Sequence, residues 1–274
     1  MNSLRGKVLA LTGAGGGIGR ALALGLAGEG ATLLLCDIHV DNLAETSAQL
    51  ARAPHITSVL DVADRKALAK WIADGLGRFG QLDGIINNAG ITTFAPFAKL
   101  EAEEFDRILS INLGAVIEGC RLALPHMRGE IGWIVNVSSV LGLIGCPTQS
   151  AYTTPKFAVR GFSETLHVEL AMTHPHVRVI CVFPGGVKTG MARNAKYIRG
   201  ISEGATAEST VAEFEAMSRT TAESAARAIV FGMMHDHRRV LVGLDAYCVD
   251  ILTRWLPTSY PKFLRWMFVS KFKI

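Results

Sequence analysis

The sequence has few charged residues and no long run of apolar residues. Charged side chains make up 19% of the 274 residues and hydrophobic side chains 49%, a balance that excludes an intrinsically disordered chain. No stretch of about 18 or more uncharged apolar residues is present, so a membrane-spanning helix is not expected. The short polar N-terminus lacks the apolar region of a signal peptide. These absences predict a cytoplasmic protein.

The sequence also lacks the spacings of a disulfide framework or a metal site. Its five cysteines are odd in number, widely separated and include no CxxC pair. The eight histidines include two close pairs, but neither has a carboxylate or cysteine at a metal-ligating spacing. We therefore expect no bound metal.

The net positive charge of the chain comes from its C-terminal end. Residues 250–274 hold five basic side chains and one acidic, which accounts for the whole formal net charge of +4. The rest of the chain offers no basic excess for a nucleic-acid-binding stripe, and we expect no nucleic-acid partner.

Aromatic residues interleave with these basic residues, a composition typical of a membrane interface: Trp255, Tyr260, Phe263, Trp266, Phe268 and Phe272. Prolines at 257 and 261 interrupt any continuous helix, so such a tail would lie on a membrane and not cross it. Two interpretations stay open. The tail contacts a membrane peripherally, or it packs over the pocket of its own or a partner subunit.

Short apolar runs alternate with amphipathic segments along residues 1–249. The runs predict buried strands at residues 7–12, 32–37, 56–61, 84–88, 132–138, 177–183 and 239–242. Helical periodicity fills the intervals at residues 17–29, 41–51, 64–79, 102–127, 150–172 and 221–235. This alternation predicts a single α/β domain: a doubly wound Rossmann-type parallel sheet of seven strands with helices on both faces. Residues 188–219 show no strong helical face and form either a mobile substrate lid or a surface excursion.

A glycine-rich turn joins the first predicted strand to the first helix. Backbone N–H groups in such a turn can approach a pyrophosphate at the positive end of the helix. Asp37 closes the second strand, where a carboxylate accepts hydrogen bonds from both adenosine ribose hydroxyls and repels a 2′-phosphate. Arg20 is compatible with either cofactor. The sequence therefore predicts a dinucleotide site that prefers NAD over NADP.

A serine, a tyrosine and a lysine occur at spacings suited to acid–base chemistry. Ser139 ends the fifth predicted strand, and Tyr152 and Lys156 share one helix face four residues apart. An ordinary tyrosine, with a pKa of about 10, is a poor base, but a neighbouring ammonium stabilises its phenolate. Pro155 would cost roughly 3 kcal/mol deep in a helix. Its place near the first turn is expected to make it tolerable.

Taken in order, these motifs resemble those of the classical short-chain dehydrogenase/reductase family, over about residues 5–245. Four further segments match the family pattern: Asp61-Val62, Asn87-Asn88-Ala89-Gly90, Asn112 and Pro184-Gly185-Gly186-Val187-Lys188-Thr189. The resemblance implies that Tyr152 is the general acid/base and that Lys156 binds the nicotinamide ribose and lowers the tyrosine pKa. Ser139 would orient the substrate oxygen, and Asn112 would hold a water between Lys156 and solvent.

The resemblance implies that the other matching residues contact NAD: Gly13, Gly15, Gly16, Gly17, Ile18, Gly19, Asp37, Ile38, Asp61, Val62, Asn88, Ala89, Gly90, Pro184, Gly185, Val187 and Thr189. The positions expected to line a substrate pocket are mostly apolar and include no basic clamp for a carboxylate or phosphate: Thr92, Thr93, Phe94, Leu141, Leu143, Ile144, Cys146 and Met191. We therefore expect a hydrophobic alcohol or ketone as substrate.

The predicted reaction is hydride transfer between NAD(H) and a carbinol or carbonyl carbon. One alternative is an NADPH-preferring reductase of acyl or lipid carbonyls. It requires Arg20 or another basic residue to bind the 2′-phosphate in spite of the Asp37 carboxylate. A second is a Rossmann-type protein that binds NAD(H) without turnover. The family resemblance further implies a homodimer or homotetramer that pairs through the helices predicted at residues 102–127 and 150–172.

Overall fold

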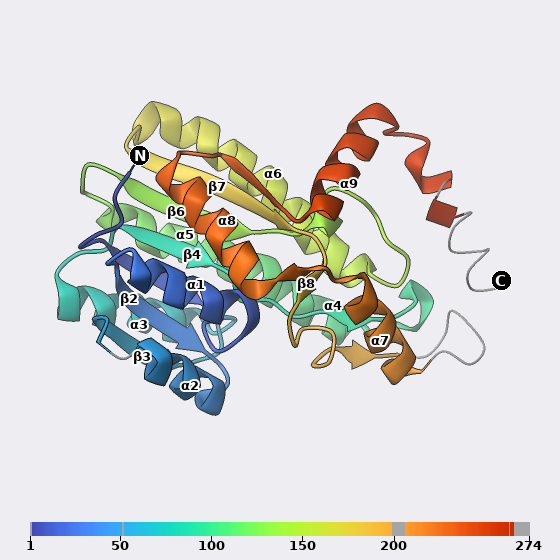
Figure 1. The fold of residues 1–274 in the computed structure, drawn as a ribbon, viewed down its shortest axis with the longest axis horizontal. Helices are drawn as coiled ribbons and strands as arrows, with labels where there is room; N and C mark the ends of the chain where they lie inside the picture. Colours follow the sequence, from blue (N-terminus) through green and yellow to red (C-terminus); the bar gives the residue numbers. More distant parts are fainter. Residues whose placement is uncertain (1, 51, 199–205, 263, 266–274) are drawn as a thin grey trace.

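A seven-stranded parallel sheet forms the centre of the computed structural model, which describes the chain except residues 1, 51, 199–205, 263 and 266–274 (Figure 1). The strand order is β11-β7-β6-β4-β1-β2-β3. The strands are β1 (Val8–Thr12), β2 (Thr32–Asp37), β3 (His55–Val59), β4 (Gly84–Asn87), β6 (Gly132–Val137), β7 (Val177–Pro184) and β11 (Arg239–Val242). The predicted doubly wound α/β architecture is confirmed.

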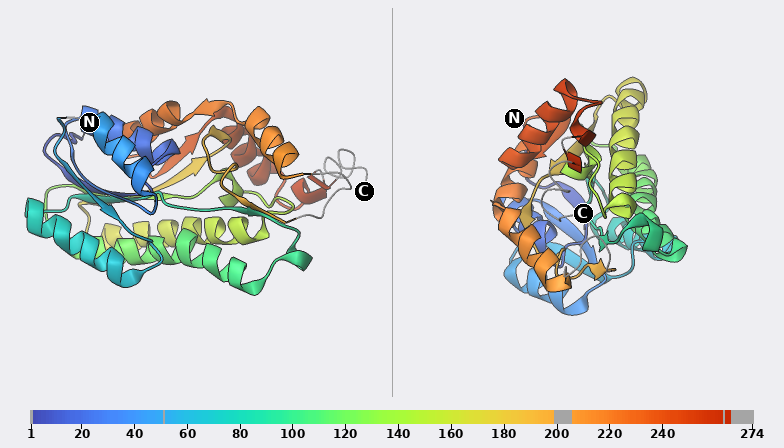
Figure 2. Two further views of the ribbon diagram at one scale, coloured as in Figure 1. Left: turned by 90° about the horizontal axis from the view of Figure 1, so that it is seen from below. Right: turned by 90° about the vertical axis from the view of Figure 1, so that its right-hand side faces the viewer.

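Helices cover both faces of the sheet (Figure 2). One face carries α1 (Gly17–Gly28), α2 (Val40–Leu50) and α8 (Ala222–Met234). The other carries α3 (Arg65–Phe79), α5 (Ala115–Ala123) and α6 (Ser150–Thr173). Every residue of β1 and β6 is buried, which explains why these strands are continuous apolar runs and not alternating patterns.

Two predicted elements differ from those in the structure. The third strand ends at Val59 and not at residue 61, because β2, the strand it pairs with, ends opposite Val59. The helix predicted over residues 102–127 has four parts: α4 (Ala102–Leu109), a π-helical turn η2 (Ser110–Gly114), α5 and a 3-10 turn η3 (Leu124–His126). By length and composition this continuous segment could cross a membrane, but here it packs against the sheet and against α3 and α6 as a core helix.

The segment over residues 188–219 contains a helix that its sequence did not predict. Helix α7 (Ala207–Met217) begins at a capping box formed by Thr206 and Ser209. None of its residues is fully buried, which explains why no apolar stripe marks it in the sequence. Short strands hold the segment in place. At its ends, β8 (Val187–Lys188) pairs with β10 (Thr220–Thr221), and within it β9 (Lys196–Tyr197) pairs with β5 (Thr93–Phe94).

Helix α9 (Leu244–Trp255) crosses the boundary predicted between residues 249 and 250. It packs on β11 and on the 3-10 turn η4 (Val140–Gly142), so the folded body extends at least to Trp255. The helix ends before Pro257, where an interruption was predicted. Four aromatic residues of the predicted tail lie outside the described residues: Phe263, Trp266, Phe268 and Phe272.

A buried polar network joins the sheet to α5 and α6. Asn87 donates a hydrogen bond to Asn136 (2.8 Å), and Asn136 donates to the Ser163 hydroxyl (3.0 Å). Gly119 of α5 lies so close that a Cβ atom there would collide with the Asn87 side-chain oxygen. Because buried amides must keep their hydrogen bonds, the network fixes the distance between α5 and β4.

We expect Gly119→Ala to lower the free energy of unfolding by about 1–3 kcal/mol, since the added methyl group must displace Asn87 from its partner. Gly77→Ala is the matched control, because a Cβ at this position in α3 meets no atom within 4 Å. It should stabilise the protein by up to about 1 kcal/mol through helix propensity. Urea unfolding of the two variants measures both effects. Equal changes of the same sign in the free energy of unfolding of the two variants would show that the Asn87 contact does not affect stability.

Candidate active site

The glycine-rich turn lies between the carboxyl end of β1 and the start of α1. Gly13 and Gly17 have φ values of +67° and +51°, in the left-handed region that favours glycine. A Cβ at Gly13 would also stand 2.8 Å from the Ala89 Cα. Gly16 occupies the N-cap position of α1 and provides no side-chain cap, so the first N–H groups of α1 are available to an anion.

Thr12 connects this turn to the loop that follows β4. Its hydroxyl accepts hydrogen bonds from the backbone N–H groups of Asn88 (3.0 Å) and Ala89 (3.1 Å). The Asn88 side chain donates to the carbonyl groups of Thr12 and Gly13, both at 3.1 Å. The predicted contact residues of the two loops therefore meet at one place. The sequence interpretation assigned no role to Thr12.

Asp37 and Arg20 both bind the turn, but in different ways. One Asp37 carboxylate oxygen accepts from the Gly15 N–H (2.8 Å) and the other from the His39 N–H (2.9 Å). The Arg20 guanidinium donates to the Gly15 carbonyl (2.7 Å) and the Thr46 hydroxyl (3.0 Å), and it pairs with Glu45 (2.8 Å). The Arg20 guanidinium is thus bound to other residues of the protein, and the charged group at the carboxyl end of β2 is the Asp37 carboxylate.

The predicted catalytic side chains lie together in the fold and are buried. Exposed fractions are 7% for Ser139, 8% for Tyr152, 3% for Lys156 and 0% for Asn112. The Ser139 hydroxyl is near enough to Tyr152 to act on its pKa, and the Lys156 Nζ lies 5.5 Å from the centroid of the Tyr152 ring. Helix α6 continues through Pro155 to Thr173, so the four-residue spacing of Tyr152 and Lys156 keeps both on one face.

The end of β6 holds Lys156 in place. The Lys156 Nζ donates a hydrogen bond to the Val137 carbonyl (2.8 Å), and the Ser138 hydroxyl donates to the backbone carbonyl of Lys156 (2.7 Å). A side chain at Gly142 would collide with both Ser138 and the Lys156 backbone. The lysine is therefore fixed at both ends by residues that precede and follow Ser139.

Asn112 lies in the π-helical turn η2 and not in a regular helix. Its amide donates to the Ile91 carbonyl (2.8 Å) and accepts from the Ile91 N–H (2.9 Å). A Cβ at Gly90 would be 3.2 Å from the Asn112 oxygen and 3.6 Å from the Lys156 Nζ. The Asn112 side chain thus holds the loop after β4 next to Lys156; π-helical turns are common at functional sites.

Burial shifts the two titratable groups in opposite directions. It raises the pKa of Tyr152 above its ordinary value, and the Ser139 hydroxyl acts against that increase. It lowers the pKa of Lys156 to about 8, and the nearby Cys181 acts weakly against it. The sequence interpretation expected a lowered tyrosine pKa in the presence of the oxidised cofactor. Without it, desolvation of the phenolate dominates.

The residues expected to contact the rest of NAD lie around this centre. Asp61 accepts a hydrogen bond from the Ala63 N–H (2.9 Å), and Val62 is buried, whereas Ile38 is 56% exposed. Val187 pairs with Thr220, and the Thr189 methyl group packs against Gly17. Pro184 ends β7, and Gly185 leaves no room for a side chain beside Asp245. These loops all follow carboxyl ends of strands, where ligands bind in such sheets.

The structure divides the residues expected to line a substrate pocket into two groups. Phe94, Leu141, Cys146 and Met191 are partly exposed and stay candidates for a pocket wall. By contrast, Leu143 packs with Cys181 and Phe183 in a small core cluster. Ile144 is buried, and the Thr93 hydroxyl donates to the buried Glu104 (2.6 Å). Packing and internal hydrogen bonds account for these three positions and also for Thr92, which is buried and donates to Gln149.

Four residues that sequence reasoning missed connect this wall to the rest of the site. Gln149, which precedes α6, accepts from Thr92 (3.0 Å) and donates to the Thr93 carbonyl (3.2 Å). Glu104 also accepts from Lys196 of β9 (3.3 Å). Phe214 of α7 packs edge-on against Phe94, with ring centroids 6.4 Å apart. Of these four residues, only Gln149 had a position in the sequence that could have suggested it, because it lies three residues before Tyr152.

Burial acts to raise the pKa of Glu104, but hydrogen bonds from Thr93 and Lys196 outweigh it, and the net shift is downward. The carboxylate is therefore ionised where it holds β9 to the loop after β4.

We expect the stability of the protein to depend on pH through Lys156. Its pKa falls from 10.5 to about 8 on folding, so the unfolded chain binds more protons between these pH values. Stability should therefore rise with pH across this window, by up to about 3 kcal/mol. Lys156→Met should abolish the rise, whereas Lys70→Met, at an exposed lysine, should retain it. Urea unfolding across this pH range measures how the free energy of unfolding of each variant changes with pH. If it changes equally with pH in wild type and Lys156→Met, the expected fall of the Lys156 pKa on folding is contradicted.

Comparisons with known proteins agree with this geometry. A family model described as short chain dehydrogenase matches residues 7–198. The chain is 42% identical over 268 residues to an oxidoreductase named SadH from Mycobacterium tuberculosis, which covers 96% of this chain and 95% of that protein. It is 37% identical over 195 residues to levodione reductase from Leifsonia aquatica, covering 69% and 72% of the two chains.

Among solved structures, a short-chain dehydrogenase/reductase from Burkholderia phymatum in complex with NAD superposes with a TM-score of 0.85 at 26% identity. The match covers 93% of this chain and 95% of that one. The structure of levodione reductase gives a TM-score of 0.78 at 30% identity, over 89% and 99% of the two chains. Sequence, fold and site agree, and this chain belongs to the short-chain dehydrogenase family of oxidoreductases.

Proposed function

We propose that the protein transfers a hydride between NAD(H) and the carbinol or carbonyl carbon of a hydrophobic alcohol or ketone. The observation that carries this proposal is that Ser139, Tyr152 and Lys156 are all buried and that the Lys156 Nζ lies 5.5 Å from the centroid of the Tyr152 ring. This arrangement gives one point in the fold two hydroxyl groups for a substrate oxygen and a neighbouring positive charge. Acid–base chemistry at a carbonyl oxygen needs these groups.

The residues present fit a bound dinucleotide. The uncapped start of α1 and the glycine turn would hold the pyrophosphate, and Asp37 would hold the adenosine ribose. Asp61 and Val62 would contact the adenine, and Asn88, Ala89 and Gly90 would line the cleft. Lys156 would bind the nicotinamide ribose, and Val187 and Thr189 the carboxamide. The nicotinamide, when bound, supplies or accepts the hydride.

Tyr152 exchanges a proton with the substrate oxygen. In alcohol oxidation the Tyr152 phenolate oxygen takes the hydroxyl proton of the substrate, and in ketone reduction the Tyr152 hydroxyl donates its proton to the carbonyl oxygen. The Ser139 hydroxyl donates to the same substrate oxygen and orients it. Lys156, as an ammonium, stabilises the tyrosine phenolate against the desolvation that raises its pKa.

The substrate preference rests on the apolar wall. Phe94, Phe214, Leu141 and Met191 provide hydrophobic surface, and burial raises the pKa of the half-buried Cys146 to about 11, so its thiol stays neutral. The names of two relatives point to carbonyl substrates. They are levodione reductase and a 3-oxoacyl-[acyl-carrier-protein] reductase from Thermotoga maritima, which is 37% identical over 191 residues. The second name keeps an acyl carbonyl as the alternative substrate.

The proposed assembly is a homodimer or homotetramer in which copies pair through α5 and α6. Apolar side chains exposed on these helices support this proposal: Ile117, Phe157, Val168 and Met172.

We expect Tyr152→Phe to lower kcat/KM by about 10²- to 10⁴-fold, because phenylalanine cannot exchange a proton. The absorbance of NADH follows its formation or loss with a series of hydrophobic alcohols and ketones. NADH binding, measured by fluorescence, should be retained. Tyr247→Phe, at an exposed tyrosine of α9, is the control and should behave as wild type. Full turnover by Tyr152→Phe excludes it as the acid/base.

We expect wild type to prefer NAD and Asp37→Ser to raise kcat/KM with NADP by about tenfold or more, a change of at least about 1.4 kcal/mol. The substitution removes the carboxylate that repels a 2′-phosphate, while no Lys or Arg occurs among residues 37–44 to attract one. Asp41→Ser, at another exposed acid nearby, should leave the preference unchanged. A wild-type enzyme that prefers NADP would instead support the acyl carbonyl reductase.

A further inference from the structure

The outer face of α9 is apolar. Four large side chains on it are strongly exposed: Leu244 (80%), Tyr247 (52%), Ile251 (58%) and Trp255 (81%). Cys248, also exposed, lies among them. Their spacing of three and four residues places them on one side of the helix. We call these five residues the α9 face.

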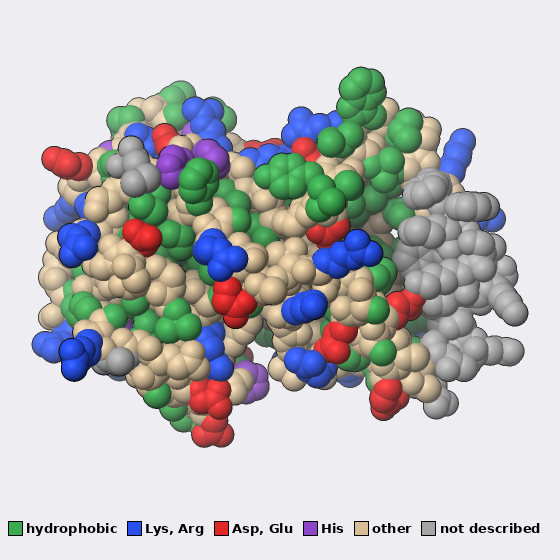
Figure 3. Space-filling view, in the orientation of Figure 1, with side chains coloured by type: hydrophobic (Ala, Val, Ile, Leu, Met, Phe, Trp, Pro, Cys, Tyr) green, Lys and Arg blue, Asp and Glu red, His purple; other side chains and the backbone are tan. Residues whose placement is uncertain are grey.

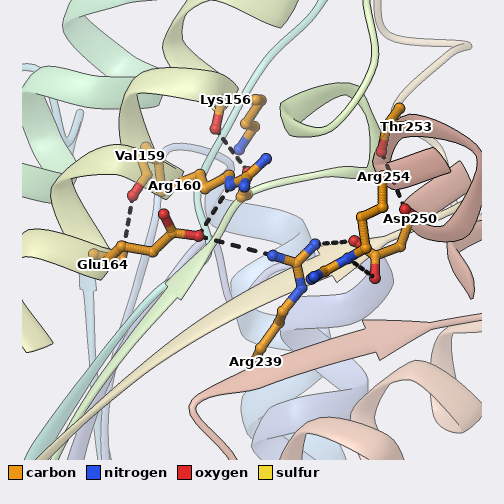
Figure 4. A network of polar contacts seen from close by, with 10 residues as sticks. Lys156, Val159, Arg160, Glu164, Arg239, Asp250, Thr253 and Arg254 are labelled. Atoms are coloured by element: carbon orange, nitrogen blue, oxygen red, sulfur yellow. Dashed lines mark hydrogen bonds and ion pairs between the residues drawn. The ribbon is translucent and has the colours of Figure 1, made fainter. Parts of the chain in front are cut away.

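The opposite side of α9 is anchored to the body of the protein (Figure 4). Arg239 of β11 forms an ion pair with Asp250 and approaches Glu164 of α6 at 3.8 Å. Ala246 is fully buried, and Val249 packs against the core cluster beneath η4. The helix is thus held firmly, with the α9 face directed away from the sheet.

Both acidic residues of α9 are occupied by internal contacts. Asp250 pairs with Arg239 and also with Arg254, and Asp245 accepts a hydrogen bond from the Gly186 N–H (2.6 Å). Basic side chains are exposed at the C-terminal end of the helix and just after it, at Arg254, Lys262 and Arg265. The exposed charge beside the α9 face is therefore positive.

The space-filling view shows hydrophobic side chains gathered over α9, with Lys and Arg side chains nearby (Figure 3). Apolar residues flanked by cations, with a tryptophan at the same end, match the chemistry of an anionic lipid interface. A second copy of the chain is a poorer fit, because a standard protein interface uses roughly 20–30 residues a side and this face offers five.

We propose that the α9 face binds the surface of a membrane that contains anionic lipids. The helix lies in the plane of the interface, Trp255 sits at headgroup level, and Arg254, Lys262 and Arg265 contact lipid phosphates. Because α9 packs on η4, which directly follows Ser139, this orientation brings the substrate side of the site close to the lipid. An apolar substrate dissolved in the bilayer would then reach it from there.

Flotation of the full-length protein with vesicles tests the proposal. Wild type should float with vesicles that contain phosphatidylglycerol and less with vesicles of phosphatidylcholine alone. The double variant Ile251→Glu, Trp255→Glu should reduce binding by about tenfold or more, since it removes two buried apolar side chains from the lipid. Lys262→Gln should reduce it about fivefold, and only on the anionic vesicles.

Val59→Glu is the matched control, because Val59 of β3 is also strongly exposed (55%) but lies at the opposite edge of the sheet from β11 and α9; it should float as wild type does. An unchanged melting temperature and NADH affinity establish that each variant is folded. Wild type that does not float with anionic vesicles, or a double variant that floats equally well, overturns the proposal. A double variant that sediments as a smaller species than wild type also overturns it, because the face then binds a second copy.

Discussion

A lysine amine buried at the carboxyl end of β6 is the constraint on which the rest of the site depends. An ammonium group removed from water costs several kcal/mol unless hydrogen bonds replace its solvation. The Val137 carbonyl supplies one such bond, and Ser138 fixes the lysine backbone. The strand end, the turn η4 and the start of α6 must therefore keep one arrangement. That arrangement places the charge beside the Tyr152 ring before any substrate binds, so no reorganisation is needed for it to act.

The second constraint is the close approach of two loops at the point where the strand order reverses. From β1 the chain continues to β2 and β3 on one side, and β4 lies on the other. A crevice at such a switch point is where doubly wound sheets bind ligands. Here the Thr12 hydroxyl and the Asn88 amide bridge the crevice, and Gly13 permits the approach. The glycine-rich turn is therefore tied by hydrogen bonds to the loop that follows β4.

Strong local signals were enough to predict most of this from the sequence. Buried parallel strands are continuous apolar runs, a glycine turn needs its residues in order, and Tyr152 and Lys156 need only helical spacing to meet. The missed features depend on contacts between distant segments. Helix α7 buries no residue fully, so only its capping box marks it. Glu104 and Lys196 are 92 residues apart, and no spacing rule joins them. Thr93 and Leu143 follow catalytic motifs, yet their side chains serve packing and hydrogen bonding.

These long-range contacts connect the segments around Phe94 to the helix that carries Tyr152. Lys196 of β9 holds Glu104, Glu104 holds Thr93, and Gln149 binds both Thr92 and the Thr93 carbonyl immediately before α6 begins. A substrate that displaces β9 must therefore strain the residue that starts the helix carrying Tyr152. A substrate that packs on Phe94 and Phe214 leaves the connection intact. If the proposed function holds, selection among apolar substrates would therefore depend on α7 and β9, while Ser139, Tyr152 and Lys156 keep their positions.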